Sequence, residues 1–273
     1  MKEPATIRVL TSDDVLQAFE LSSLAGWNQT AADWSSLLNL APEGCFGIQI
    51  ENTLAATATL FCYGSSLAWI GMVLTHPDFR RLGLASKLLR HLLAIADKLA
   101  IRTVKLDATE MGEALYRSLD FGPEQPVERW MRSASLSSSP EMACSRDPSS
   151  WEEVDRTAFG VDRGFLIRAL LQQGKCYSMS GSYLLTRAGR NASYLGPWVA
   201  RDTRSARQLL ELGLRRPSAN GWYWDILPAN QEAIALAKEF GFTLQRRLLR
   251  MSRGEPLGGR EKFIYAIAGF EFG

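Results

Sequence analysis

Histidine is scarce in this chain of 273 residues, and its cysteines are few and far apart. The two histidines, His76 and His91, are too few for a histidine-based metal site or a catalytic triad. The four cysteines are Cys45, Cys62, Cys144 and Cys176. Because they form no CxxC pair and no metal-ligand spacing, we expect reduced thiols, as in cytosolic proteins, and no bound metal.

Long apolar runs and an excess of one charge are missing as well. No run reaches the roughly 18 apolar residues of a transmembrane helix, and residues 1–6 show no apolar signal-peptide core. The 31 basic and 29 acidic residues leave a net charge of +2, which gives no footprint for nucleic acid or an anionic membrane. We therefore expect a soluble, cytoplasmic protein with neither nucleic acid nor membrane as a partner.

The most informative segment is a basic turn between an expected strand at 68–74 and an expected amphipathic helix at 84–100. The turn reads Arg-Arg-Leu-Gly-Leu-Ala. Free backbone N–H groups and the positive end of the helix dipole meet there, which suits an anion such as a pyrophosphate. Gly83 allows close backbone approach, and Arg80 and Arg81 add charged donors.

This turn resembles the acetyl-CoA pyrophosphate loop of the GCN5-related N-acetyltransferase (GNAT) superfamily, through the pattern Arg80-x-x-Gly83-x-Ala85. The alternative is an ordinary strand-to-helix turn with two solvated arginines. The expected elements also follow the order of the GNAT core, strand-helix-helix-three strands-helix-strand-helix-strand. They are expected at residues 5–10, 15–25, 33–40, 45–50, 53–62, 68–74, 84–100, 103–107, 110–119 and 127–132.

The chain divides into two halves at a stretch rich in serine and proline, as a linker should be. We predict an N-terminal catalytic domain over 1–134, a linker over 135–150 and a second domain over 151–273. The resemblance implies an α/β (α+β) fold with two tandem GNAT-like domains, each a mixed twisted sheet flanked by helices.

A weak internal repeat relates the halves at an offset of 121 residues. Both copies resemble the second GNAT motif, Asn-x-x-Ala-x-x-Leu-Tyr-x-x-x-Gly-Phe. The first half keeps the tyrosine as Tyr116 but has Thr109 for the asparagine. The second keeps Asn230 but has Ala237 for the tyrosine. No Arg-x-x-Gly-x-Ala turn follows the strand expected at 193–199, so we expect a degenerate second domain and one acyl-CoA site per chain.

The second half further resembles the C-terminal domain of some bacterial tandem acetyltransferases. For the first half, the resemblance implies a pyrophosphate site formed by the backbone of residues 81–86, with arginine side chains that either contribute or are solvated. Backbone groups in the preceding strand would bind the pantetheine and the developing oxyanion. The expected acyl-CoA-binding residues are Met72, Val73, Leu74, Arg80, Arg81, Leu82, Gly83, Leu84, Ala85 and Ser86.

Two side chains are candidates for moving protons. Tyr116 matches the family's usual acid for the leaving thiolate, since its reference pKa of about 10 is close to the thiol's, about 8.5. Its alternative role is packing against CoA. The strand at 68–74 contains no acid, so Asp107, at the end of the next strand, is the candidate base for the amine. The alternative for Asp107 is capping the helix that follows.

These residues predict an N-acetyltransferase that uses acetyl-CoA and no metal. A small-molecule primary amine would attack the thioester directly, from among the helices at 13–40 or from the cleft between the halves. One alternative is a non-catalytic acyl-CoA-binding or regulatory module, and another is an interaction protein that binds no CoA. The acceptor, the acyl chain length and the oligomeric state, including a homodimer, stay open.

Overall fold

The computed structural model describes residues 6–134 and 152–273, so the linker expected at 135–150 lies outside the described residues. The first half contains β1 (Thr6–Val9), η1 (Ser12–Asp14), α1 (Val15–Leu24), α2 (Ala31–Leu40), β2 (Cys45–Ile50), β3 (Thr53–Tyr63), β4 (Leu67–Thr75), η2 (Pro77–Phe79), α3 (Leu84–Lys98), β5 (Thr103–Ala108), α4 (Glu110–Arg117) and β6 (Gly122–Arg132). Every strand and helix expected up to residue 132 is present in the expected order, and β6 begins five residues earlier than expected.

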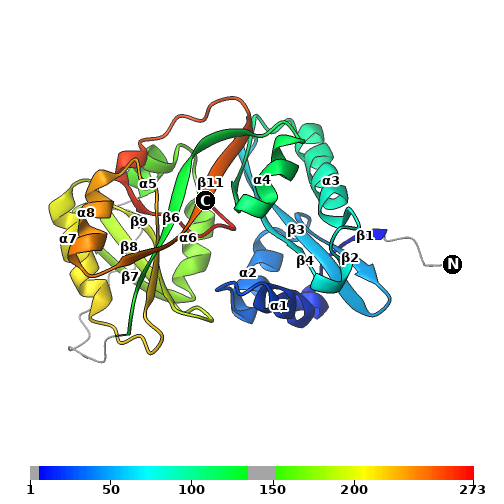
Figure 1. The fold of residues 1–273 in the computed structure, drawn as a ribbon. Coiled ribbons are helices and arrows are strands. Elements are labelled where there is room, and N and C mark those ends of the chain that lie inside the picture. Colours follow the sequence, from blue (N-terminus) through cyan, green and yellow to red (C-terminus); the bar gives the residue numbers. More distant parts are fainter. Residues whose placement is uncertain (1–5, 135–151) are drawn as a thin grey trace.

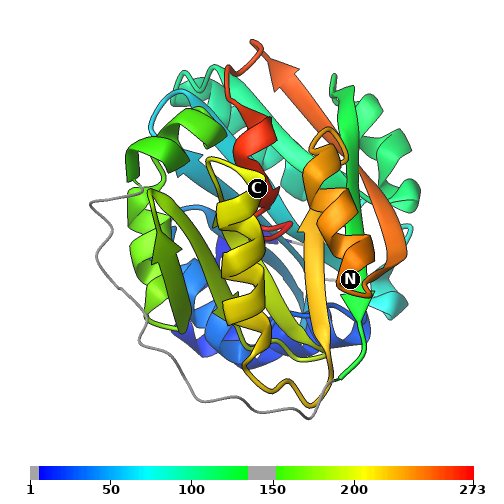
Figure 2. The same cartoon turned by 90° about the vertical axis from the view of Figure 1, so that its left-hand side faces the viewer.

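The second half contains α5 (Glu152–Phe159), α6 (Gly164–Leu171), β7 (Gly174–Met179), β8 (Ser182–Arg187), β9 (Ser193–Val199), α7 (Thr203–Leu214), β10 (Trp222–Ile226), α8 (Gln231–Glu239), β11 (Thr243–Gly254), η4 (Glu261–Phe263) and β12 (Ile264–Ala266). Figure 2 shows α7 and α8 on the outer face of this half's strands. No helix in the described part of the chain has the length and hydropathy needed to cross a bilayer.

Local sequence explains where the helices of the first half begin and which face they bury. Thr30 and Asp33 form a capping box at the start of α2, with the Asp33 amide 3.2 Å from the Thr30 hydroxyl. On α3 the buried side chains recur three and four residues apart, as expected of one helix face. They are Leu84, Leu88, Leu89, Leu92, Leu93 and Ala96. The buried apolar residues of α1 and α2 belong to one hydrophobic cluster, and those of α3 belong to another. The first two helices and α3 therefore cover separate parts of the core.

The described strands form one continuous mixed sheet in the order β1-β2-β3-β4-β5-β11-β6-β10-β9-β8-β7, with β12 paired to β9. The expected α/β class is therefore confirmed. Two long strands, β6 and β11, lie in the middle of the molecule and join its halves (Figure 1). The early start of β6 follows from this pairing, because Gly122 is in register with Ser252 of β11.

The halves exchange these last strands. β11 follows α8 of the second half but pairs with β5 of the first, and β6 follows α4 of the first half but pairs with β10 of the second. One ion pair accompanies each exchange: Asp107 faces Arg250 across β5 and β11, and Asp225 faces Arg129 across β10 and β6. Each half thus contributes one strand to the part of the sheet that belongs to the other half. The domain limits expected from the sequence stay a prediction.

The last residues of the chain lie at the centre of the molecule, between the halves (Figure 1). The Tyr63 hydroxyl donates to the carbonyl of Phe272 at 2.6 Å, and Trp69 Nε1 donates to the carbonyl of Phe270 at 2.9 Å. Tyr63 and Phe272 belong to a hydrophobic cluster that also contains Phe159 of α5. The site described next is therefore built by both halves.

Candidate active site

The site begins where β4 and β5 separate. These parallel strands are in register at residues 67–69 and 103–105, and no pairing is found between them beyond Trp69 in the described structure. An extra residue in β4 opposite β3 forms a bulge, and Met72 adopts a left-handed φ of 48° there. Thr57 Oγ1 donates to the Met72 carbonyl at 2.8 Å and holds the bulge in place. Past Trp69, the backbone groups of β4 thus have no pairing with β5 in the described structure.

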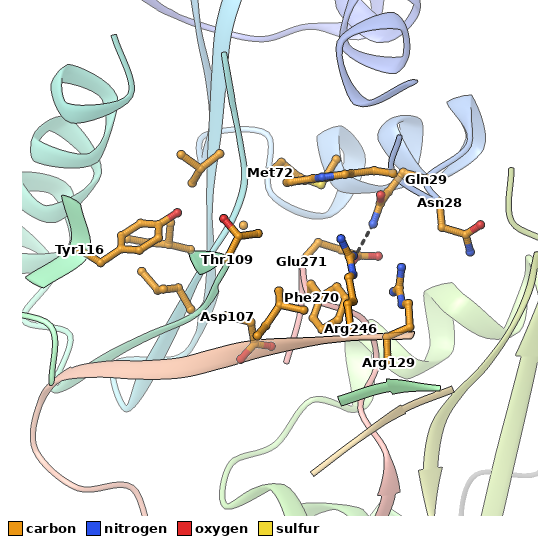
Figure 3. Close-up of a pocket in the computed structure, with 16 residues that line it drawn as sticks. Asn28, Gln29, Met72, Asp107, Thr109, Tyr116, Arg129, Arg246, Phe270 and Glu271 are labelled. Carbon is orange, nitrogen blue, oxygen red and sulfur yellow. Dashed lines mark hydrogen bonds between the residues drawn. The ribbon is translucent and has the colours of Figure 1, made fainter. Parts of the chain in front are cut away.

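The opening is a cavity with an empty volume of about 630 Å³, part of it open to solvent. It lies between β4 and β5, the segment joining α1 to α2, and strands and loops from the second half (Figure 3). Its lining residues are Trp27, Asn28, Gln29, Ile70, Gly71, Met72, Val73, Leu106, Asp107, Thr109, Tyr116, Arg129, Arg246, Leu248, Phe270 and Glu271. A second hollow of about 300 Å³ shares Asn28, Gln29, Arg129 and Glu271 and continues toward Arg187.

Tyr116 points into this cavity from α4 (Figure 3). Its ring packs over Gly112, where an added Cβ would lie 2.9 Å from Tyr116 Cε2. Within the described residues, no hydrogen bond engages its hydroxyl. Burial raises the pKa of Tyr116 to about 12. The phenol is therefore protonated at neutral pH and has a proton to donate.

The basic turn lies past the bulge, where β4 ends and α3 begins. The first hydrogen bond inside α3 runs from the amide of Lys87 to the carbonyl of Gly83, so the three preceding amides point out of the helix end. Gly83 has a φ of 75°, and an added Cβ there would meet nothing within 4 Å. Arg80 and Arg81 are exposed, and no ion pair engages them in the described part of the chain. The turn is thus an open, positively charged helix end.

The predicted residues fall into two groups. Met72, Val73, Asp107 and Tyr116 line the cavity, whereas Leu74 and the turn from Arg80 to Ser86 are not part of its lining. The second group continues from the same end of β4 into the start of α3. A ligand long enough to span both would run along β4 from the turn to the bulge.

Asp107 is held in the joint between the halves. Arg250 Nε and Nη2 donate to its two oxygens at 2.9 and 3.1 Å, and neither side chain is appreciably exposed. Burial raises the pKa of Asp107, and the pairing with Arg250 opposes that rise. Asp225 and Arg129 form the equivalent pair at 2.6 to 2.7 Å. The repetition favours a structural role for Asp107, whose service as the catalytic base stays a prediction.

Sequence reasoning did not single out Glu271 as a site residue. This carboxyl is 4% exposed and accepts a hydrogen bond from Gln29 Nε2 at 3.0 Å. Its backbone lies against the bulged strand, since a Cβ added at Gly71 would be 2.8 Å from Glu271 Cα. Burial raises its pKa. A single acidic residue in the otherwise apolar run after Tyr265 could have marked Glu271 as a functional residue. Its contact with β4 could not be predicted from the sequence.

Two family models match the sequence. One, described as the acetyltransferase (GNAT) family, matches residues 13–121, and the other, an acetyltransferase (GNAT) domain, matches residues 152–266. Together they span most of the chain. The chain is a tandem-domain member of the GNAT superfamily. No curated protein matches its sequence.

Solved structures share this GNAT fold. A putative acetyltransferase from Pyrococcus horikoshii aligns with a TM-score of 0.87 at 21% identity, over 100% of this chain and 97% of that one. A tandem GNAT protein from the clavulanic acid biosynthesis pathway aligns with a TM-score of 0.63 at 14% identity, over 93% and 99%. A GNAT protein from Sphaerobacter thermophilus gives 0.62 at 14% identity, over 93% and 98%. At these identities the likeness shows the fold alone.

In the second GNAT domain, the chain itself fills the corresponding opening. β12 pairs with the end of β9, and the Ile267 amide donates to the Asp225 carbonyl of β10 at 3.1 Å. At the start of α7, the Asp202 carboxylate accepts from the Ser205 amide at 2.7 Å. The gap between β9 and β10 is therefore filled by residues 264–267, and the start of α7 is capped by Asp202. Ala237, in the place of the motif tyrosine, is fully buried and has no proton to give.

Proposed function

We propose that this protein transfers an acetyl group from acetyl-CoA to a primary amine of a small molecule, at one site in its first half. The observation that carries the proposal is that the bulge at Met72 and Tyr116 line one opening between β4 and β5, while the open start of α3 follows the end of the same strand β4. The chain would therefore bind both ends of a long thioester and present a proton donor beside the same gap.

The open end of α3 fits a pyrophosphate. The amides of Leu84, Ala85 and Ser86 precede the first hydrogen bond inside the helix, and free space lies over Gly83. The guanidinium groups of Arg80 and Arg81 are free to add charge. Backbone N–H groups of the bulged strand would hold the pantetheine and stabilise the negative oxygen that forms at the carbonyl.

The transfer needs three proton movements. The amine nitrogen attacks the thioester carbon, the C–N bond forms, and the C–S bond breaks with its electron pair left on sulfur. Tyr116 gives its proton to that thiolate and regains one from the nitrogen of the new amide. Glu271, buried against the bulge, accepts the proton that an arriving ammonium must lose before attack.

Changing Tyr116 to phenylalanine tests the acid. We expect kcat to fall by about 100- to 10,000-fold, the usual contribution of a positioned general acid. The dissociation constant for acetyl-CoA should change little, because the ring and its packing on Gly112 are kept. Thiol release with an amine panel measures the first quantity, and calorimetry the second. Tight acetyl-CoA binding by the wild type with no turnover of any amine would favour the non-catalytic binding module instead.

The occupied opening of the second domain predicts the stoichiometry. Titration calorimetry should give one acetyl-CoA per chain, because Asp202 and residues 264–267 fill the equivalent site. A fitted value near two would contradict the reading of the second half as degenerate. Gly83→Asp provides the control, since it should weaken the single binding event and reveal no second one.

A further inference from the structure

The cavity is lined by Arg129 and Arg246, and the adjoining hollow adds Arg187. Arg129 is neutralised by the bidentate pair with Asp225. Arg187, in the adjoining hollow, lies 3.6 Å from an oxygen of Asp33 and also donates to a backbone carbonyl. Arg246 forms no ion pair with any carboxylate of the described residues, and its buried Nε has no hydrogen-bond partner. Of the two arginines that line the cavity, Arg246 is therefore the one without a carboxylate partner among the described residues.

The backbone directs Arg246 to this place. An extra residue in β11, opposite the interval between Trp130 and Arg129 of β6, forms a bulge that ends at Arg246. Bulges redirect the side chains beside them. The guanidinium of Arg246 lies over the ring of Phe270 and lines the cavity with it (Figure 3). Its sequence neighbour Arg247 is mostly exposed and pairs with Glu128 at 2.8 Å instead.

The charged form of Arg246 is disfavoured by burial without an anionic partner. Removal from water and the nearby charge of Arg129 lower the pKa of Arg246, so both favour its neutral form. An anion bound at the guanidinium would relieve both effects, and a carboxylate matches its fork-shaped set of donors. The partly buried, unmatched arginine is thus suited to an anionic group on a ligand in the cavity.

Two hydrogen-bond acceptors line the same cavity near Arg246 (Figure 3). Gln29 donates its Nε2 to Glu271, which fixes the orientation of the amide because a carboxylate can only accept. Gln29 Oε1 is then buried without a partner. That oxygen and the Glu271 carboxylate can both accept from an ammonium, beside the bulge where the thioester carbonyl is proposed to bind.

We propose that the acetyl acceptor is a small amino acid-like molecule whose carboxylate pairs with Arg246 while its amine faces Gln29 and Glu271. This proposal rests on the acyltransferase function proposed above. A purely cationic amine would leave Arg246 unmatched beside Arg129, whereas a zwitterion offers a carboxylate to Arg246 and an ammonium to Gln29 and Glu271. The bound ammonium passes one proton to Glu271, and its nitrogen then forms the C–N bond. The sulfur leaves with the electron pair and takes the Tyr116 proton, and Tyr116 regains a proton from the nitrogen of the new amide.

Matched acceptors test the charge requirement. The common L-amino acids, β-alanine and 4-aminobutyrate are each compared with their amides, which keep the shape and lack the carboxylate. Binding to the CoA-loaded protein is followed by calorimetry and turnover with acetyl-CoA by thiol release. We expect at least one acid to bind and react better than its amide by about 10-fold or more, as a charge-assisted pair implies.

Variants on β11 identify the group responsible. Arg246→Gln should lower the affinity for that acid by about 10- to 100-fold and leave its amide unaffected, with partial recovery in Arg246→Lys. Arg247→Gln, one residue away and exposed, should keep the preference. The proposal is overturned if no panel member binds, if acids and amides behave alike, or if Arg246→Gln keeps the preference. Arg246-dependent binding of an acid without thiol release would instead contradict the acyltransferase function and keep only the carboxylate site at Arg246.

Discussion

Glu271→Gln is expected to lower kcat by about 100- to 10,000-fold, the usual effect of removing a general base. The amide has nearly the shape of the carboxyl but cannot accept the proton of the incoming ammonium. Affinity for acetyl-CoA should be unchanged, because the proposed CoA contacts are backbone groups of β4 and the start of α3. Thiol-release kinetics and calorimetry measure the two quantities, with exposed Glu255→Gln as the matched control.

The pH dependence of the same variant follows from the surroundings of Glu271. Burial raises its pKa, and Asp33 of α2 adds to the rise, whereas Arg187 of β8 and the hydrogen bond from Gln29 oppose it. A base must be ionised to act, so wild-type kcat/KM should fall as pH drops through this raised pKa. That limb should be missing in Glu271→Gln. A pH profile with the same acidic limb in both proteins would assign it to another group.

Glu271→Gln should not lose thermal stability, although it loses activity. A carboxyl whose pKa is higher in the folded than in the unfolded state stabilises the fold while it is protonated, and this contribution is lost as pH rises through the folded pKa. Glutamine stays neutral at all pH values. Glu271→Gln should therefore unfold at a temperature at least equal to that of the wild type at neutral pH. A large drop in melting temperature would mean that the lost activity reflects misfolding.

Gly83→Asp is expected to weaken acetyl-CoA binding by about 5- to 1000-fold. Two unit charges 4 Å apart repel by about 1 kcal/mol in water and about 4 kcal/mol near a protein surface, which corresponds to this range. The substitution gives α3 an acid at its start, as Asp202 gives one to α7. The protein has room for the side chain, and aspartate tolerates the left-handed φ of 75° better than most residues do.

Gly83→Asn separates charge from shape, because asparagine has the same size and the same tolerance of this conformation. Titration of acetyl-CoA should show a much weaker affinity for the aspartate variant than for the asparagine variant. Melting temperatures should remain close to that of the wild type, since an acid at a helix N-terminus stabilises by about 0.3–1 kcal/mol. Equal affinities of the two variants would mean that the pyrophosphate does not bind at this helix end.

The predicted elements around the basic turn were recognisable because their signals are local. The strand before the turn, the glycine within it and the leucine pattern of α3 lie within one stretch of about thirty residues, and each follows from backbone sterics or side-chain periodicity. The position of Tyr116 on α4 is similarly local. The comparison of the halves rests on equally local signals, since a missing glycine turn and a missing tyrosine can be read directly.

Asp107 shows where such reasoning ended. Within its own half it is an acid at the end of a strand beside the cleft, which suits a base. Its partner Arg250 lies 143 positions later, on a strand that reaches β5 through the exchange with β6. Strand pairing of this kind depends on which edges meet in the folded chain, and no local pattern carries that information.

The sequence by itself determined the order of the elements, the single basic turn and the tyrosine of α4, because propensity, periodicity and turn chemistry act over neighbouring residues. Only the tertiary structure decided how β6 and β11 are exchanged, which acid of the cavity has no ion pair among the described residues, and which arginine there lacks an anion. Glu271 and Arg246 come from the second half, and they reach the first-half site through packing against Gly71 and through a bulge in β11. Long-range packing of this kind sets the environment of each charge, and the environment decides its role.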